Sequence, residues 1–168
     1  ALEKLEQQQE KAVALCRKLG VPRGLMRRTV QLQGWDKGLD DDDMATLGML
    51  MRTAGGLPGL MSLCIQRNGI GDPGMRSLFQ GLGRRALPKL RALALDTNKF
   101  GLAGAEALAD ALSNGAMPDL NDLALCCNPL NSCGITALAK PLRNHPALQK
   151  LMLTDTNMSD EGMASLFG

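Results

Sequence analysis

The most constraining feature of this chain is a pattern of leucines, asparagines and glycines that occurs four times in its last two-thirds. Counted from a first leucine, leucine or isoleucine falls at offsets 0, 3 and 5, asparagine at 8, an apolar residue at 10 and glycine at 14. The pattern begins at Leu60, Leu90, Leu120 and Leu148, and a proline stands two residues before each start. The first three starts are 30 residues apart, and the fourth follows after 28. A fixed period of this length indicates a protein built by stacking one repeated unit.

The order L-x-x-L-x-L-x-x-N-x-L followed by a helical segment resembles the leucine-rich repeat. The glycine and two leucines after the turn, such as Gly104, Leu108 and Leu112, resemble the ribonuclease-inhibitor-like subclass. The resemblance covers residues 58–168 closely and residues 25–57 more loosely. It implies an α/β leucine-rich-repeat solenoid, or horseshoe, with a short parallel sheet on the concave side and helices on the convex side.

Each copy predicts a short strand, a turn and a helix that begins near the glycine. Apolar residues occupy only alternate strand positions, so Leu63 and Ile65 should point inward while Cys64 and Gln66 point outward. A helix after every strand allows only parallel pairing of successive strands. Glycine at offset 14 is expected where the chain turns tightly into each helix.

The asparagines Asn68, Asn98 and Asn128 should form a structural ladder that satisfies backbone groups left unpaired by the turns. Thr156 takes this place in the fourth copy and can replace only part of the bonding. Pro141 falls within the helix of the third copy and is expected to bend or shorten it.

The chain divides into three parts. Residues 1–24 form an amphipathic helix that is expected to cap the first end of the solenoid. A coiled-coil or partner helix is the alternative. Residues 25–57 form a degenerate first repeat, and residues 58–168 form four leucine-rich repeats, the last incomplete. The apolar positions of the N-terminal helix are Leu2, Leu5, Ala12, Val13, Cys16 and Leu19.

The degenerate repeat is aligned by placing Val30 and Leu32 at offsets 3 and 5, which puts Trp35 in the asparagine position. The acidic run from Asp40 to Asp43 then precedes the helix. Calcium loops separate their ligands with other residues and a glycine, and this run lacks that spacing. Capping of a helix N-terminus therefore explains the four carboxylates better than a cation site.

Gly69, Gly71 and Gly74 form a G-x-G-x-x-G sequence between a strand and a helix, with Asp96 about twenty residues further on. Only the last of these glycines recurs in the other copies, so a glycine-rich repeat turn explains the sequence better than dinucleotide binding. The sequence predicts no cofactor.

Cys126, Cys127, Cys133 and His145 are the only residues that could form a soft-ligand cluster. Their spacing is not that of a zinc site, and His145 is the only histidine available as a base for a cysteine nucleophile. We therefore expect no metal, no catalytic residue, no small-molecule substrate and no enzyme activity.

Composition gives further bounds on partners and compartment. The formal net charge of +2 is too balanced to favour nucleic acid or an anionic membrane, and aromatic platforms for single strands are scarce. No apolar run is long enough to span a membrane. Five irregularly spaced cysteines favour a reducing, intracellular compartment, the cytoplasm by default, with an organelle as the alternative.

Solenoids bind along their concave surface, so the outward strand positions are the predicted protein-binding residues. These are Ser62, Cys64, Gln66, Arg67, Ala92, Ala94, Asp96, Thr97, Asp122, Ala124, Cys126, Cys127, Lys150, Met152, Thr154 and Asp155. The alignment of the degenerate repeat adds Thr29, Gln31, Gln33 and Gly34. Small, weakly charged residues suit close approach of a helix or an extended segment.

Basic residues gather at Arg23, Arg27 and Arg28 and in a second group, the basic rim, formed by Arg84, Arg85, Lys89 and Arg91. A solvated edge is the simpler interpretation, and a site for an acidic partner is the alternative. The sequence predicts a non-catalytic protein-interaction scaffold, an accessory or structural subunit of a larger intracellular assembly. The alternative is a regulatory domain that activates, inhibits or senses an enzyme or GTPase through the basic rim. The last helix leaves apolar residues open, so further repeats or a partner are expected to cover that end.

Overall fold

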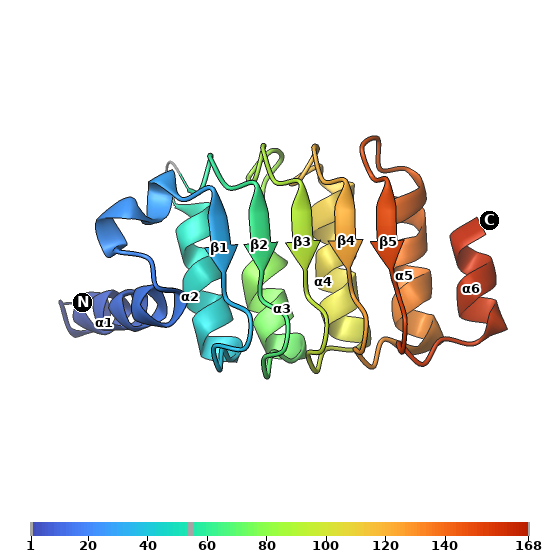
Figure 1. Ribbon diagram of the computed structural model, residues 1–168, viewed down its shortest axis with the longest axis horizontal. Coiled ribbons are helices and arrows are strands. Elements are labelled where there is room, and N and C mark those ends of the chain that lie inside the picture. The colour runs from blue at the N-terminus through green and yellow to red at the C-terminus, as the bar shows by residue number, and fades with distance from the viewer. Residues whose placement is uncertain (1, 54–55, 168) are drawn as a thin grey trace.

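The computed structural model describes residues 2–53 and 56–167 and shows strand–helix units stacked in a single row (Figure 1). The elements are α1 (Leu2–Leu19), η1 (Arg23–Arg28), β1 (Gln31–Gln33), α2 (Asp41–Arg52), β2 (Ser62–Cys64), α3 (Asp72–Phe79), β3 (Ala92–Ala94), α4 (Leu102–Ser113), β4 (Asp122–Ala124), α5 (Asn131–Arg143), β5 (Lys150–Met152) and α6 (Asp160–Phe167). The strands form one parallel sheet in the order β1-β2-β3-β4-β5. Helices α2 to α6 cover one face of this sheet. The predicted α/β leucine-rich-repeat solenoid is confirmed.

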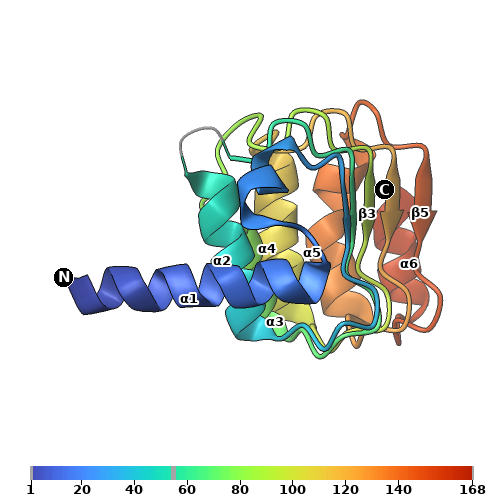
Figure 2. The same cartoon turned by 60° about the vertical axis from the view of Figure 1, so that its left-hand side comes forward.

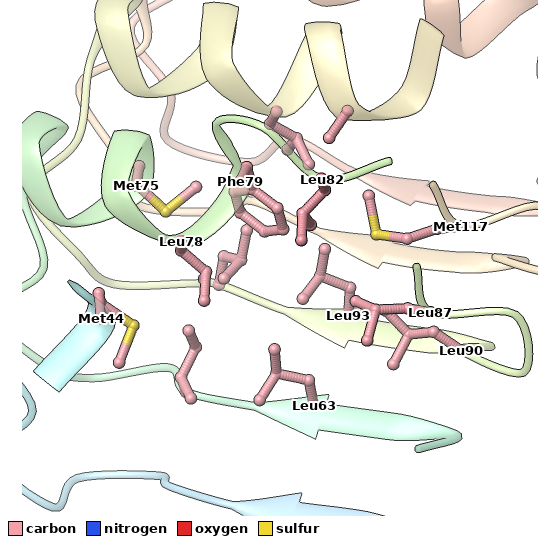
Figure 3. Close-up of a cluster of buried hydrophobic side chains, with 14 of the residues drawn as sticks. Met44, Leu63, Met75, Leu78, Phe79, Leu82, Leu87, Leu90, Leu93 and Met117 are labelled. Carbon is pink, nitrogen blue, oxygen red and sulfur yellow. The ribbon is translucent and has the colours of Figure 1, made fainter. Parts of the chain in front are cut away.

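The core lies between the sheet and the helices. Leu63, Leu93 and Leu123 are in register on neighbouring strands and are buried, because only the central residue of each three-residue strand points toward the helices. Figure 3 shows the helix side chains Met75 and Phe79 in the same buried cluster as Leu63 and Leu93. The core therefore extends along the row, and each unit depends on its two neighbours.

The asparagines connect each turn to the preceding one. Asn98 donates from Nδ2 to the carbonyls of Leu95 in its own repeat and Ile65 in the preceding one, at 2.9 and 3.1 Å. Its Oδ1 accepts the N–H of Ile70 at 3.3 Å. Asn68 and Asn128 make the equivalent donations. These side chains supply the partners that buried turn backbone needs.

The glycines at offset 14 serve helix packing. Gly74 lies inside α3 and is absent from the residues with positive φ, so the expectation of a tight turn is wrong. A Cβ added to Gly74 would lie 2.3 Å from Oδ1 of Asp41, at the start of the preceding helix. The absence of a side chain lets consecutive helices approach each other closely.

The alignment predicted for the first repeat is wrong by two residues. Leu32 pairs with Leu63, so it lies at offset 3 rather than 5. Counting on from this pair puts Trp35 opposite Gln66 and Lys37 in the asparagine position. Val30, expected to be buried, is 46% exposed. Gly34 takes the place of an inward leucine, and a Cβ there would lie only 3.0 Å from Cδ2 of Leu19.

Helix α1 covers the β1 end of the core with its last turns. Leu15 and Leu19 are buried, and Leu19 packs beside Gly34 where this repeat lacks an inward side chain. Lys11 pairs with Asp42 at 3.0 Å and Lys18 with Asp43 at 2.6 Å. The hydrogen bond to Asp43 raises the pKa of Lys18. The N-terminal half of α1 projects beyond the body (Figure 2).

The acidic run caps α2, as predicted. The Asp40 carboxylate accepts the Asp43 N–H at 3.0 Å, and Asp43 accepts the Asp40 N–H at 3.1 Å, which completes a capping box. The bond from the Asp43 N–H lowers the pKa of Asp40. Helix α5 continues past Pro141 to Arg143, so the proline does not shorten it.

Candidate protein-interaction face

The face of the sheet turned away from the helices carries the outward side chains of five strands, and we call it the open sheet face (Figure 1). It includes the residues that follow each strand at offsets 6 and 7. Most of the positions predicted from the sequence are half-buried or exposed, whereas Ala124 is buried. The register also corrects the contribution of the first repeat, which is Gln31, Gln33, Trp35 and Asp36. Thr29 lies before the strand, and Gly34 is buried at an inward position.

The β1 end of this face has its bulkiest groups. Trp35, the only tryptophan of the chain, is 50% exposed. The guanidinium carbon of Arg67 lies 5.6 Å from the centroid of its ring, which is cation–π geometry. The alignment expected from the sequence puts Trp35 in the asparagine position, so it does not identify this side chain as part of the face. Keeping Leu39 at offset 10, where Ile70 stands in the next repeat, would have placed it correctly.

Gln66 lies beside this pair in the register. Its Oε1 is buried and has no hydrogen-bond partner within residues 2–53 and 56–167. Its neighbour Arg67 is exposed and adopts a positive φ of 56°. Leaving a buried acceptor unpaired costs free energy, and a donor on a bound molecule would relieve this cost only after the Gln66 side chain turned outward.

The centre of the open sheet face is lined by small side chains. Ala92 and Ala94 are half-buried, and Ala124 is buried in register with Ala94. Asp96 accepts the backbone N–H of Cys126 at 2.9 Å, which fixes its carboxylate in the next turn. The central surface is therefore low and allows another backbone to approach closely.

The β5 end is more charged. Lys150 and Asp122 approach to 3.9 Å across the last two strands, and Thr154 and Asp155 are exposed. Both partners of the ion pair are largely exposed, so the pair contributes little to stability.

Cys126, Cys133 and His145 lie on different segments of the chain. Burial raises the pKa of Cys126, which disfavours the thiolate that a nucleophile requires. Cys133 lies on α5, and the ring of His145 bonds the carbonyl of Met117 at 3.0 Å. Among the residues that the structure describes, no group of three or more His, Cys, Asp or Glu side chains could hold a metal ion.

The glycine sequence at Gly69, Gly71 and Gly74 is explained by contacts between repeats. The Gly71 N–H at the start of α3 donates to Oδ1 of Asp41 at 2.8 Å. Asp72 accepts in the same way from α4, through the N–H groups of Gly101 and Gly104. A carboxylate of the preceding repeat thus occupies the position where a phosphate would bind a helix N-terminus.

The basic rim lies on the connection between α3 and β3. Arg84, Arg85, Lys89 and Arg91 are all exposed. None of them lies within 4.0 Å of an acidic group in the described part of the chain. The rim therefore presents unneutralised positive charge.

Three segments match a family model described as a leucine-rich repeat, at residues 58–79, 86–109 and 144–167. These segments include β2, β3 and β5. No curated protein matches the chain. None of the helices described is both long and apolar enough to cross a membrane.

Proposed function

We propose that this chain of leucine-rich repeats is a non-catalytic protein-interaction scaffold that binds a partner protein across the open sheet face. In this proposal it is an accessory or structural subunit of a larger intracellular assembly. Repeats of this kind generally mediate contacts between proteins, and solenoids use their extended sheet surface for them.

The observation that carries the proposal is the half-exposed Trp35 stacked with Arg67 at one end of that face. Tryptophan and arginine dominate the binding energy of protein interfaces, because they bury large areas and still make directed contacts. An exposed tryptophan has no stabilising role comparable to that of a buried one, so its position here favours a binding role.

The rest of the face suits a protein segment better than a small molecule. The alanines at its centre, Ala92, Ala94 and Ala124, allow a backbone to lie close to the sheet. A helix or an extended segment that crosses the strands would contact Trp35 at one end and Met152 at the other.

The test is affinity capture from native lysate, with the retained proteins identified by mass spectrometry. Trp35→Ala and Arg67→Glu should each weaken retention, by about 30-fold in Kd if they remove roughly 2 kcal/mol. Leu102→Ala, at an exposed apolar residue on the helix side, is the matched control. Equal retention by all three variants would exclude the open sheet face as the binding surface.

A second function is supported by the basic rim. Four exposed cationic side chains without acidic partners could contact the active site or an acidic patch of a regulated enzyme or GTPase. Replacement of Arg84, Arg85 and Arg91 by glutamate separates the two functions. Loss of a single enzyme with this variant would favour a regulatory domain, whereas retention of many stoichiometric subunits would favour the scaffold.

The compartment belongs to the same proposal. All five cysteines are free thiols, and Cys127 and Cys133 are exposed. Exposed free thiols persist in a reducing compartment, which favours an intracellular site for this scaffold.

A further inference from the structure

A second surface lies at the N-terminal end, away from the open sheet face. A groove of about 370 Å³ runs between α1, η1 and α2. Its apolar wall includes Leu5, Cys16, Met26 and Leu50, and Arg23 and Arg27 stand at its edge. We call it the N-terminal groove.

The burial of helix α1 changes along its length. Ala12, Leu15, Cys16 and Leu19 are buried against the body, whereas residues 2–11 are all exposed. Leu5 is 53% exposed, although it precedes Ala12 by seven residues and so belongs to the same helical stripe. Figure 2 shows this half of the helix extending away from the rest of the chain. The projecting half thus presents an apolar stripe that its own body does not cover.

The two edges of this stripe carry charges of opposite sign. Lys11 and Lys18 stand on one edge and are paired with Asp42 and Asp43 of α2. Glu6 and Glu10 stand on the other edge, in a shallow hollow that Arg17 and Arg23 also line. Arg23, Arg27 and Arg28 are exposed and have no acidic group within 4.0 Å in the described residues.

We propose that the N-terminal groove binds the projecting half of α1 from a second copy of this chain, in a symmetric dimer. The groove requires an apolar helix with carboxylates beside its stripe, and residues 2–11 provide Leu5 with Glu6 and Glu10 at its edge. The exchange closes by symmetry, because each copy offers one projecting half-helix and one groove.

The symmetry also fixes the orientation. Each projecting half lies beside the body-bound half of the other α1, so the two helices run antiparallel. A two-fold axis perpendicular to both helices places their glutamate edges on the same side. Arg23 lines the same hollow as Glu6 and Glu10 of its own chain, so it lies on that side as well. In the dimer it would face the other copy's Glu6. Pairing of Glu6 with Arg23 across the axis offsets the repulsion between the glutamates.

Sedimentation equilibrium of the purified chain tests the dimer. A dimer is expected at micromolar concentrations, and its Kd should rise with salt because the pairs are exposed at the edge. Leu5→Asp should raise Kd by at least about tenfold, since it places a charge in the apolar contact. Leu102→Asp on the helix side is the matched control and should leave Kd unchanged. The proposal would be overturned if the chain remained a monomer at protein concentrations 100-fold above the micromolar range. A dimer that Leu5→Asp does not weaken would also overturn it.

A charge exchange makes the test specific. Arg23→Glu and Glu6→Lys should each weaken the homodimer, because like charges then face each other at both symmetric contacts. A mixture of the two variants restores opposite charges at both contacts and should form a heterodimer with nearly wild-type Kd. Failure of the mixture to associate would reject the pairing. At concentrations below the dimer Kd, circular dichroism melts of the single variants should match that of the parent chain, because both residues are exposed in the monomer.

The dimer is independent of the scaffold function proposed above. Trp35→Ala should leave Kd for self-association unchanged, and Leu5→Asp should leave an intact open sheet face. Trp35→Ala therefore tests the scaffold function and Leu5→Asp tests the dimer, so either proposal can fail without the other.

Discussion

The two ends of the repeat array differ in how deeply they bury the equivalent inward leucines of the sheet. At the first end, Leu32 is fully buried because α1 covers β1. At the other end, Leu151 and Leu153 are only half-buried, and they line an apolar groove of about 550 Å³ beside α6. Equivalent residues in the central repeats, such as Leu123, are fully buried. A repeat therefore owes its burial to its neighbours as much as to its own sequence.

The hydrogen bonds follow the same difference. The Oδ1 of Asn98 accepts the Ile70 N–H of the preceding turn, and the Asn98 N–H donates to the Oδ1 of Asn128 at 3.1 Å. Thr156 bonds only the carbonyl of Leu153 with its hydroxyl. The Asn128 N–H then has no acceptor among the residues described. The β5 end is thus less buried than the centre, and Thr156 supplies no Oδ1 acceptor to the turn before it.

The largest effect is expected in the central sheet. Leu123→Ala should lower the free energy of unfolding by about 2–5 kcal/mol, because it leaves a cavity between fully packed repeats. Leu151→Ala should cost only about 1–2 kcal/mol, because Leu151 is already half in contact with solvent. Urea denaturation of both variants measures the difference. An equal loss of unfolding free energy in the two variants would show that the β5 end and the centre do not differ as described.

Removal of the α1 contact should make the first end resemble the last. Leu19→Ala should cost about 2 kcal/mol, because Leu19 fills the space beside Gly34 where the first repeat lacks a side chain. Hydrogen exchange should become faster in β1 and remain unchanged in β4. Faster exchange throughout the sheet would instead indicate a single cooperative unit without a distinct end.

A gain of stability is expected at the β5 end. Thr156→Asn would supply the Asn128 N–H with an Oδ1 acceptor like the one that Asn128 supplies to the Asn98 N–H, and should add about 1 kcal/mol. The thermal midpoint measures this gain. Thr156→Val removes the hydroxyl at similar volume and is the control, which should lower stability.

The smallest effect concerns the cap of α2. Asp40→Ala should cost about 0.5–1 kcal/mol at neutral pH, because the Asp43 N–H loses its acceptor. The pKa of Asp40 is lowered in the folded chain, so its contribution is present above the unfolded pKa of about 3.9 and is lost as pH falls through the folded value. The difference between parent and variant should therefore shrink below about pH 4. A difference that stays constant down to pH 2 would contradict the role of the ionised carboxylate.

Much of the fold could be predicted from the sequence because its determinants are local. Leu63, Asn68 and Gly74 recur at fixed offsets, and each offset corresponds to one strand, turn or helix position. The first repeat was misaligned because Gly34 and Lys37 stand where a leucine and an asparagine mark the other copies. Without those residues, the periodicity gave two acceptable alignments.

The sequence by itself determined the repeat, the parallel order of its strands and the side of the sheet that each leucine faces, because these follow from spacing along the chain. Only the tertiary structure decided the exposure of Trp35, the cap formed by Leu19 and the bond from Gly71 to Asp41. Each of these depends on how close two separate segments come in space. That distance is set by side-chain packing between neighbouring units, which a spacing rule within one unit does not contain.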